Sequence, residues 1–295
     1  HQFRRMAASM DLSDLGTVRA VLARHGFRFS RSLGQNFIVD PSVCPRMAEL
    51  SGAGRGVGVL EIGPGVGVLT RELAARAEKV VAVELDRALE PVLRETLAGC
   101  PNVRLVWGDV RKLDLKELLR KELDGLNGIL CANLPYYITS PVILSVLEEK
   151  IPFSSLTVMV QKEAAQRLCA EPGTRACGAV SAAVRYYAEP RILFEVGRGC
   201  FFPRPDVDSA VLRMDVRREP PVRVPDEKAF FRLVKAAFLM RRKMAVNSIS
   251  SGLGLPKERV AEAFRKAGIP ATARAEELRM DGLAALAGLL LGKET

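Results

Sequence analysis

The middle of the chain alternates apolar runs with amphipathic stretches. Apolar runs occupy residues 56–63, 79–86, 103–110 and 128–135. The segments between them, residues 68–77, 88–99 and 114–123, have the spacing of apolar positions that is typical of helices. A strand that is buried on both faces has no polar face, so continuous apolar strands separated by helices predict a parallel sheet covered on both sides.

The alternation of strands and helices continues beyond residue 135 and ends in an antiparallel pair of strands. Residues 140–150 have helical spacing, residues 154–168 read as a strand followed by a helix, and residues 191–197 and 209–217 resemble an antiparallel pair of strands. We therefore predict an α/β fold, doubly wound, with a mostly parallel sheet of seven strands.

The two ends of the chain read as helical. Residues 15–26 form one predicted helix, and residues 40–52 form another, with Asp40 as its N-cap and Pro41 at its first position. From about Pro225 the pattern contains helices only, over residues 226–254, 256–269 and 272–292, after a linker rich in proline and charge at residues 217–227. We expect an N-terminal extension and helix in residues 1–30, an α/β domain in 31–220 and a smaller all-α domain in 225–295. The chain starts with His1, so we take Met6 and Met10 as candidate natural starts.

Charge and composition narrow the class of protein. The chain has 44 Lys and Arg against 34 Asp and Glu, a net charge of +10, which favours a polyanionic partner such as nucleic acid. Its six cysteines are scattered without a C-x-x-C pair and it has only two histidines, so we expect no metal site. No apolar run is long enough to span a bilayer, and we expect a cytoplasmic protein that does not bind a membrane.

A glycine-rich turn follows the first predicted strand. Gly63, Gly65 and Gly67 stand directly before a predicted helix, where they allow a tight turn and bring backbone N–H groups close to a ligand. The spacing is G-x-G-x-G rather than the G-x-G-x-x-G of dinucleotide sites. It favours a cofactor that contains adenosine without a pyrophosphate. The alternative is a turn that only packs the helix on the strand.

Polar side chains end the next three strands. Glu84 lies 21 residues after Gly63, where a carboxylate can accept hydrogen bonds from both ribose hydroxyls. Asp109 ends the third strand and can accept from an adenine amine, and Asn133 ends the fourth. Ligands of open parallel sheets bind outside the carboxyl ends of the strands. Each acid alone could be a solvated side chain, but their order predicts one site.

Seven motifs together resemble one family, the small-subunit ribosomal RNA adenine dimethyltransferases, which use S-adenosyl-L-methionine. They are LGQNFIVD (33–40), EIGPGVGVLT (61–70), VELD (83–86), GDV (108–110), NLPYYITSP (133–141), QKEAAQRL (161–168) and FFPRPDVDSAV (201–211). The similarity covers about residues 30–290 and implies a Rossmann-like methyltransferase domain followed by a small helical domain. One departure is FFPRPDV, where the family usually has a third proline and a lysine at the positions of Arg204 and Asp206.

The resemblance implies a set of site residues and a substrate. The implied cofactor contacts are Gln35, Asn36, Ile38, Gly63, Gly65, Glu84, Asp109, Val110 and Asn133. The implied substrate is a pair of adjacent adenosines in the hairpin near the 3′ end of small-subunit rRNA, methylated in a pre-assembled subunit by a monomeric enzyme. Two alternatives remain: an erythromycin-resistance methyltransferase acting on large-subunit rRNA, and a non-catalytic RNA-binding assembly factor.

The stretch NLPYY carries the expected chemistry. An adenine amine is a poor nucleophile because its lone pair is delocalised into the ring. The side-chain oxygen of Asn133 and the carbonyl of Leu134 can accept hydrogen bonds from the two amine protons, which positions the lone pair toward a methyl donor. Pro135 ends the strand. Tyr136 is expected to stack on an extruded base, with Phe201 on its other face. Because neighbours in an extended segment point in opposite directions, we expect Tyr137 to pack in the core.

Basic residues gather on two separate segments. Arg28 and Arg31 lie close to Gln35, and the second cluster consists of Arg232, Lys235, Arg241, Arg242 and Lys243. Both clusters suit contacts with the phosphates of a shaped RNA. The alternative for each is a solvated helix face.

Overall fold

The computed structural model describes residues 10–28 and 36–292. Contacts divide this part of the chain into two compact units. The first contains the chain as far as Ala165 together with Arg191–Val216, and the second contains Gln166–Pro190 and the chain from Arg217 onward. Residues 166–190 thus belong with the C-terminal helices, whereas the sequence pattern placed them in a domain of residues 31–220.

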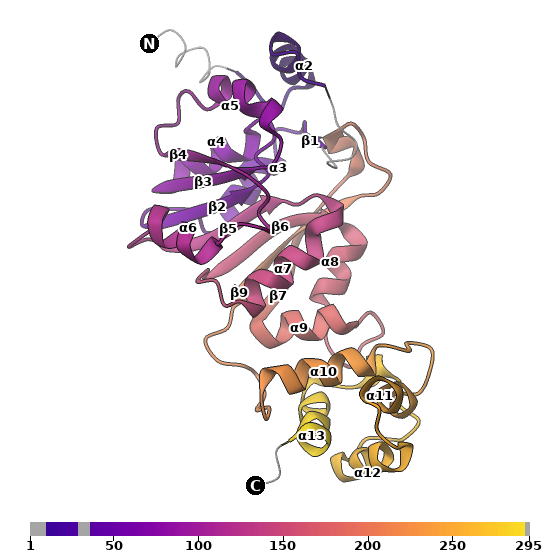
Figure 1. Ribbon diagram of the computed structural model, residues 1–295. Helices are drawn as coiled ribbons and strands as arrows, with labels where there is room; N and C mark the ends of the chain where they lie inside the picture. The colour runs from indigo at the N-terminus through magenta and orange to yellow at the C-terminus, as the bar shows by residue number, and fades with distance from the viewer. Residues whose placement is uncertain (1–9, 29–35, 293–295) are drawn as a thin grey trace. The chain divides into compact units, whose positions relative to one another are not determined.

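A sheet of seven strands forms the centre of the first unit, in the order β4-β3-β2-β5-β6-β9-β7 (Figure 1). The strands are β2 (Val57–Ile62), β3 (Lys79–Glu84), β4 (Val103–Trp107), β5 (Asn127–Asn133), β6 (Ser155–Gln161), β7 (Ala188–Val196) and β9 (Ser209–Val216). The strands from β4 to β6 pair in parallel, and β9 pairs antiparallel with β6. The prediction of a doubly wound, mostly parallel sheet is confirmed.

Helices cover both faces of this sheet, which explains why its central strands are mostly apolar. Val59 of β2 packs in a cluster with α3 (Val43–Leu50) and α4 (Val68–Arg76). On the opposite face, Gly58 lies against Leu123, at the end of α6 (Leu115–Glu122). Successive residues of a strand point to opposite faces, so a strand buried on both sides is apolar at most of its positions rather than at alternate ones.

The strand order reverses at the middle of the sheet. β2, β3 and β4 run outward in sequence, after which the chain returns through α6 to place β5 on the other side of β2. Open parallel sheets bind ligands outside the strand ends at such a reversal point. The carboxyl ends of β2 and β5 are therefore the expected place for a site.

A second, two-stranded sheet joins distant segments beside this point. β1 (Phe37–Ile38) pairs antiparallel with β8 (Phe201–Phe202), in the register Phe37 to Phe202 and Ile38 to Phe201. The sequence pattern did not predict either strand, because two residues are too few to show a period. The pairing brings Phe37 and Ile38 of the first motif next to the aromatic residues of the last.

The helix after β1 begins later than predicted. α3 starts at Val43 with Ser42 at the N-cap position, rather than at Pro41 with Asp40 as the cap. The carboxylate of Asp40 instead accepts hydrogen bonds from the backbone N and the hydroxyl of Ser42, which hold a turn before the helix. Such local hydrogen bonds compete with helix formation.

The N-terminal helix α2 (Leu15–Arg24) packs on α5 (Glu90–Thr96) in the first unit. Arg24 and His25 both contact Glu95 of α5, at 2.6 and 2.8 Å. Besides the apolar contacts, this polar contact joins the N-terminal segment to the helix that follows β3.

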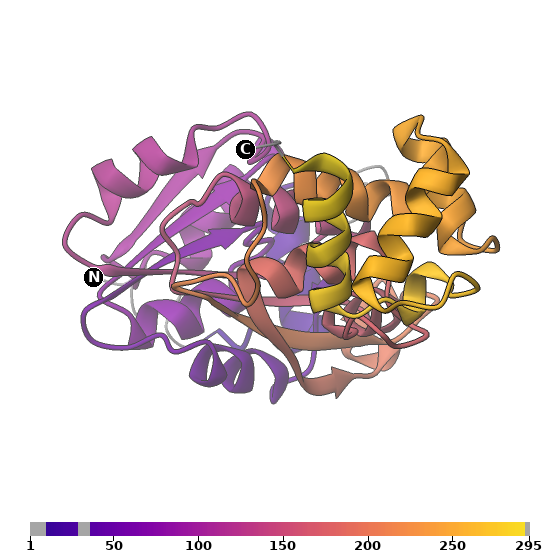
Figure 2. The ribbon, with the colours of Figure 1, turned by 90° about the horizontal axis from the view of Figure 1, so that it is seen from below.

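The second unit is mainly helical, as predicted for its C-terminal part. Its helices include α9 (Ala179–Tyr187), α10 (Glu227–Ala237), α11 (Ala245–Leu253), α12 (Lys257–Ala267) and α13 (Met280–Leu291). Figure 2 shows α13, in yellow, among the orange helices of this unit, and its Leu286 shares a buried cluster with Phe230 and Phe264. α9 joins them because Tyr186 packs on Phe230, with ring centroids 5.1 Å apart. The linker composition could not reveal this contact.

No helix within residues 10–28 and 36–292 combines the length and apolarity that crossing a membrane requires.

Candidate active site

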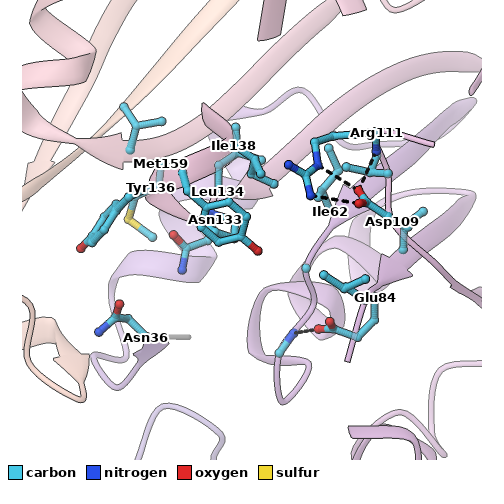
Figure 3. A pocket seen from close by; sticks show the side chains of 18 of the residues that line it. Asn36, Ile62, Glu84, Asp109, Arg111, Asn133, Leu134, Tyr136, Ile138 and Met159 are labelled. Atoms are coloured by element: carbon cyan, nitrogen blue, oxygen red, sulfur yellow. Dashed lines mark hydrogen bonds and ion pairs between the residues drawn. The ribbon is translucent and has the colours of Figure 1, made fainter. Parts of the chain in front are cut away.

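A pocket lies at the carboxyl ends of β2, β3, β4 and β5 in the first unit (Figure 3). The sequence-predicted residues that line it are Asn36, Gly63, Gly65, Glu84, Asp109, Val110, Asn133, Leu134, Pro135, Tyr136 and Phe201. In Figure 3, Glu84 and Asp109 lie on one side, and Asn36, Asn133 and Tyr136 on the other. Ile38 does not line the pocket; it is buried in the cluster with α3 and α4. Gln35 lies outside the described residues.

The glycine turn shapes the floor of the pocket. Gly65 has a φ of 59°, which L side chains rarely adopt, and a Cβ there would lie 3.1 Å from Cε1 of Phe37. Gly67, with a φ of 93°, stands at the N-cap of α4, where a Cβ would lie 3.0 Å from Leu97. Only glycine allows the turn and keeps space for a ligand along the backbone.

Glu84 faces this turn from the end of β3. Its side chain is nearly buried, and its two oxygens accept hydrogen bonds from the backbone N of Gly65 at 3.3 Å and of Asp86 at 2.9 Å. Burial raises the pKa of Glu84, while the backbone hydrogen bonds oppose that rise. A carboxylate oxygen has more than one lone pair, so each can still accept a ligand hydroxyl.

A second carboxyl lies just before the glycine turn. Glu61 is fully buried in β2, and the hydroxyl of Thr70 in α4 donates a hydrogen bond to it. Burial raises the pKa of Glu61 to about 8, so the group is mostly protonated at neutral pH. It joins strand to helix across the turn, a role that the sequence reasoning did not assign.

Asp109 occupies the end of β4 as predicted, with a partner that was not predicted. Arg111 donates from Nε to Oδ1 at 3.1 Å and from Nη2 to Oδ2 at 2.9 Å. These hydrogen bonds lower the pKa of Asp109. Val110, between the two, is buried and lines the pocket.

Asn133 is the last residue of β5. The backbone N of Leu134 still donates to the carbonyl of Met159 on β6, at 3.1 Å, so the ladder continues until Pro135 ends it. The carbonyl of Pro135 then accepts from the backbone N of Ile138 and from the hydroxyl of Thr139. These hydrogen bonds hold the turn that follows Asn133, whose side chain lies at the pocket.

The two tyrosines are both partly exposed, and the expectation that Tyr137 packs in the core is wrong. Tyr136 is 40% and Tyr137 47% exposed, whereas Ile138 is 6% exposed. The segment Tyr136–Ile138 forms a short 3₁₀ helix, η3, rather than an extended chain, so its side chains do not alternate between two sides. Ile138 is the residue that points inward.

Phe201 and Asn36 approach the pocket through the small sheet. Phe201 is buried in β8 and lines the pocket together with Tyr136. Asn36, just before β1, donates from Nδ2 to the carbonyl of Pro203 at 2.6 Å. This bond ties the predicted cofactor residue to the segment that carries Phe201. Burial raises the pKa of Tyr136.

Several lining residues were missed by the sequence reasoning, among them Phe37, Arg111, Met159 and Ser209. Met159 and Ser209 lie on the paired strands β6 and β9, inside apolar runs that carry no sign of a site. Arg111 follows the GDV motif, and its charge beside Asp109 was the available signal. Within the residues that the structure describes, no group of three or more His, Cys, Asp or Glu side chains could hold a metal ion.

The predicted RNA-binding residues lie at the surface of the unit that carries each. Arg28 is exposed in the first unit, while Arg31 lies outside the described residues. In the second unit, Arg232 and Lys235 are exposed on α10, one helical turn apart. The exposed segment between α10 and α11 carries the remaining basic residues, Arg241, Arg242 and Lys243.

Comparison with known proteins identifies the family of the chain. The family described as ribosomal RNA adenine dimethylase matches residues 26–290. Ribosomal RNA small subunit methyltransferase A of Geobacillus thermodenitrificans is 42% identical over 285 residues, which cover 95% of this chain and 97% of that protein. The protein of the same name from Alkaliphilus oremlandii is 43% identical over 276 residues, 93% of this chain and 96% of that protein.

Solved structures include a second relative. The crystal structure of the 23S rRNA methyltransferase ErmE is 28% identical, with a TM-score of 0.68, and the match covers 86% of this chain and 99% of that one. A dimethyladenosine transferase from Plasmodium falciparum, 21% identical with a TM-score of 0.69 over 84% of this chain and 95% of that one, supports the fold. On these matches and the site geometry, the chain belongs to the ribosomal RNA adenine dimethylase family.

Proposed function

We propose that the protein transfers methyl groups from S-adenosyl-L-methionine to the exocyclic amines of two adjacent adenosines in the 3′-terminal hairpin of small-subunit rRNA. The products are dimethyladenosines, formed during ribosome biogenesis. The observation that carries the proposal is a single pocket, lined at one side by Gly65 and Glu84 and at the other by Asn133 and Tyr136.

The cofactor side of the pocket fits an adenosine-containing ligand. A side chain at Gly65 would crowd the turn, and the buried carboxylate of Glu84 suits two ribose hydroxyls. Asp109 is the acceptor for an adenine amine, and Val110 provides an apolar contact beside it. S-adenosyl-L-methionine supplies a methyl group that is already strongly electrophilic.

The residues of the NLPYY turn act on the target amine. The side-chain oxygen of Asn133 and the carbonyl of Leu134 accept hydrogen bonds from the two N–H groups of the amine. These hydrogen bonds direct the nitrogen lone pair toward the cofactor. This is positioning and electrostatic preorganisation, since an amide is not a base. The proton leaves to solvent after transfer, so the mechanism needs no histidine.

Tyr136 and Phe201 hold the target base. Both line the pocket, and the partly exposed ring of Tyr136 has a face available for stacking. Enzymes that modify a base commonly extrude it and hold it between aromatic or apolar side chains. Asn36, bonded to the carbonyl of Pro203, keeps the two segments beside the base together.

We infer that rRNA within a pre-assembled small subunit is the partner, bound by a monomer in the cytoplasm. The net charge of +10 suits a polyanion, and exposed basic residues occur in both units. Arg28 in the first unit and the cluster from Arg232 to Lys243 in the second are assigned to phosphate contacts.

A second candidate function is methylation of large-subunit rRNA. The likeness to ErmE, a 23S rRNA methyltransferase, favours it. The greater identity to the small-subunit methyltransferases, over nearly the whole chain, favours the first proposal. A non-catalytic binding role is disfavoured because Asn133, Pro135 and Tyr136 all line the pocket.

Methyl transfer from labelled cofactor distinguishes these functions. Purified small and large subunits from cells that lack each modification are incubated with the protein, with Asn133→Ala as the control. We expect label in dimethyladenosine of small-subunit RNA only. Label in large-subunit RNA would establish the second candidate, and binding without label would establish the non-catalytic role.

A further inference from the structure

Arg111 makes two contacts at the rim of the pocket, of which the first is with Asp109. Its guanidinium donates to both carboxylate oxygens, and its backbone N donates to Oδ1 at 3.0 Å. A guanidinium that grips both oxygens of a carboxylate fixes the orientation of that group as well as its charge. Figure 3 shows this pair at the side of the pocket where Asp109 faces inward.

The second contact of Arg111 is with the catalytic turn. Its Cζ lies 5.8 Å from the centroid of the Tyr137 ring, within the range of a cation–π interaction. Tyr137 belongs to η3, directly after Tyr136, and lines the pocket although it is half exposed. A side chain from the segment after β4 thus contacts η3, which follows β5.

We propose that Arg111 and Tyr137 form a bridge that couples the cofactor end of the pocket to the turn that holds the target base. Arg111 is a positioning residue in this arrangement: it orients the carboxylate of Asp109 and restrains η3 through Tyr137. The inference rests on the function proposed above and extends it to two further residues. The sequence pattern had placed Tyr137 in the core and had given Arg111 no role.

The physical basis is preorganisation at both ends. A carboxylate that already accepts two hydrogen bonds from one guanidinium loses little conformational freedom when an adenine amine donates to it, which favours binding. The same guanidinium limits the movement of Tyr137 and hence of its neighbour Tyr136. Loss of the bridge should therefore affect cofactor affinity and the rate of methyl transfer together.

The competing explanation is an ordinary surface ion pair. The side chain of Arg111 is 47% exposed, and exposed pairs contribute little in water. A matched control is Arg120, whose Nε donates to Oε2 of Glu117 at 2.9 Å on α6, outside the pocket lining. If Arg111 formed only a surface ion pair, its substitution would have the same small effect as substitution of Arg120.

The test uses the full chain and S-adenosylhomocysteine as the calorimetric probe. We expect Arg111→Met to weaken binding about fivefold or more, and Tyr137→Ala about two- to fivefold, the scale of an exposed cation–π contact. Tyr137→Phe keeps the ring and should bind like the wild type, as should Arg120→Met. The double variant of Arg111 and Tyr137 should bind no more weakly than Arg111→Met alone, because both changes break one bridge.

Single-turnover methyl transfer to small subunits, at saturating cofactor, provides the second readout. We expect Arg111→Met to lower this rate about fivefold, although Arg111 lies at the cofactor end of the pocket. Its melting temperature should be within a few degrees of that of the wild type. Additive losses in the double variant, or an Arg111→Met protein as active and as tightly binding as Arg120→Met, would overturn the bridge. If the wild type did not bind the probe at all, both the bridge and the proposed function would fail. If the wild type bound the probe and the losses in the two variants were additive, the bridge alone would be rejected.

Discussion

The backbone N of Gly65 donates to Oε1 of Glu84 at 3.3 Å, so a hydrogen bond joins the glycine turn after β2 to the carboxylate at the end of β3. The second oxygen of Glu84 is held by Asp86, at 2.9 Å. Because the carboxylate is fixed by backbone groups, it does not have to be ordered when it accepts hydrogen bonds from a ribose.

We expect Glu84→Ala to weaken cofactor binding by roughly 1.5–3 kcal/mol, the usual scale for losing hydrogen bonds to a charged acceptor. Isothermal calorimetry with S-adenosylhomocysteine measures the change, and a thermal melt shows whether the variant is folded. An unchanged affinity in a folded variant would remove Glu84 from the ribose site.

Glu61 predicts a pH dependence of stability. Its folded-state pKa is about 8, above the ordinary value of 4.5, so the folded chain keeps a proton that the unfolded chain releases between these values. This group's contribution to the free energy of unfolding therefore falls as pH rises from about 4.5 to about 8, by at most about 1.4 kcal/mol per pH unit.

Glu61→Gln removes the titration and keeps an acceptor for the hydroxyl of Thr70. Urea unfolding of both proteins from pH 5 to 8 tests the assignment. The stability of the variant relative to the wild type should increase with pH. A difference that stays constant across this range would show that Glu61 does not retain its proton.

Asn133→Ala should lower the rate of methyl transfer by about 100-fold or more, since it removes one preorganised acceptor of the reacting amine. RNA binding should be nearly unchanged, because this interaction contributes mainly in the transition state. Single-turnover kinetics and filter binding on small subunits measure the two quantities. Equal losses in binding and in rate would contradict the assigned role.

Tyr136→Ala should lose roughly 1–3 kcal/mol of base stacking, and Tyr136→Phe should retain most activity because the ring remains. Tyr136 is partly exposed, so neither change should unfold the protein. Rates and melting temperatures of both variants decide the matter. If Tyr136→Phe were as inactive as Tyr136→Ala while folded, the hydroxyl rather than the ring would be the functional group.

Charge reversal at Lys235, Arg241 and Arg242 should weaken RNA association and reduce its salt dependence by about 0.7–0.9 log units per lost phosphate contact. Cofactor affinity should not change, since none of these residues lines the pocket. Affinity for small subunits measured across salt concentrations gives the slope. The same slope in wild type and variant would assign these residues to a solvated helix face.

Local patterns in the sequence, with the family resemblance, identified the sheet, its helices and half of the residues that line the pocket. Strands buried on both faces are apolar at most positions, and the parallel strands end at one edge, so Gly63, Glu84, Asp109 and Asn133 could be placed together before the structure was known. The motifs around them carried the family resemblance.

Other features depended on contacts between distant segments. The pairing of β1 with β8, the position of α9 with the C-terminal helices and the contact of Arg111 with Tyr137 all join residues that no local period relates. Tyr137 shows the reason most clearly: alternation along an extended chain predicted a buried ring, but the backbone after Pro135 turns into a 3₁₀ helix that buries Ile138 instead. The direction of a side chain in a turn depends on the surrounding packing, which only the folded chain supplies.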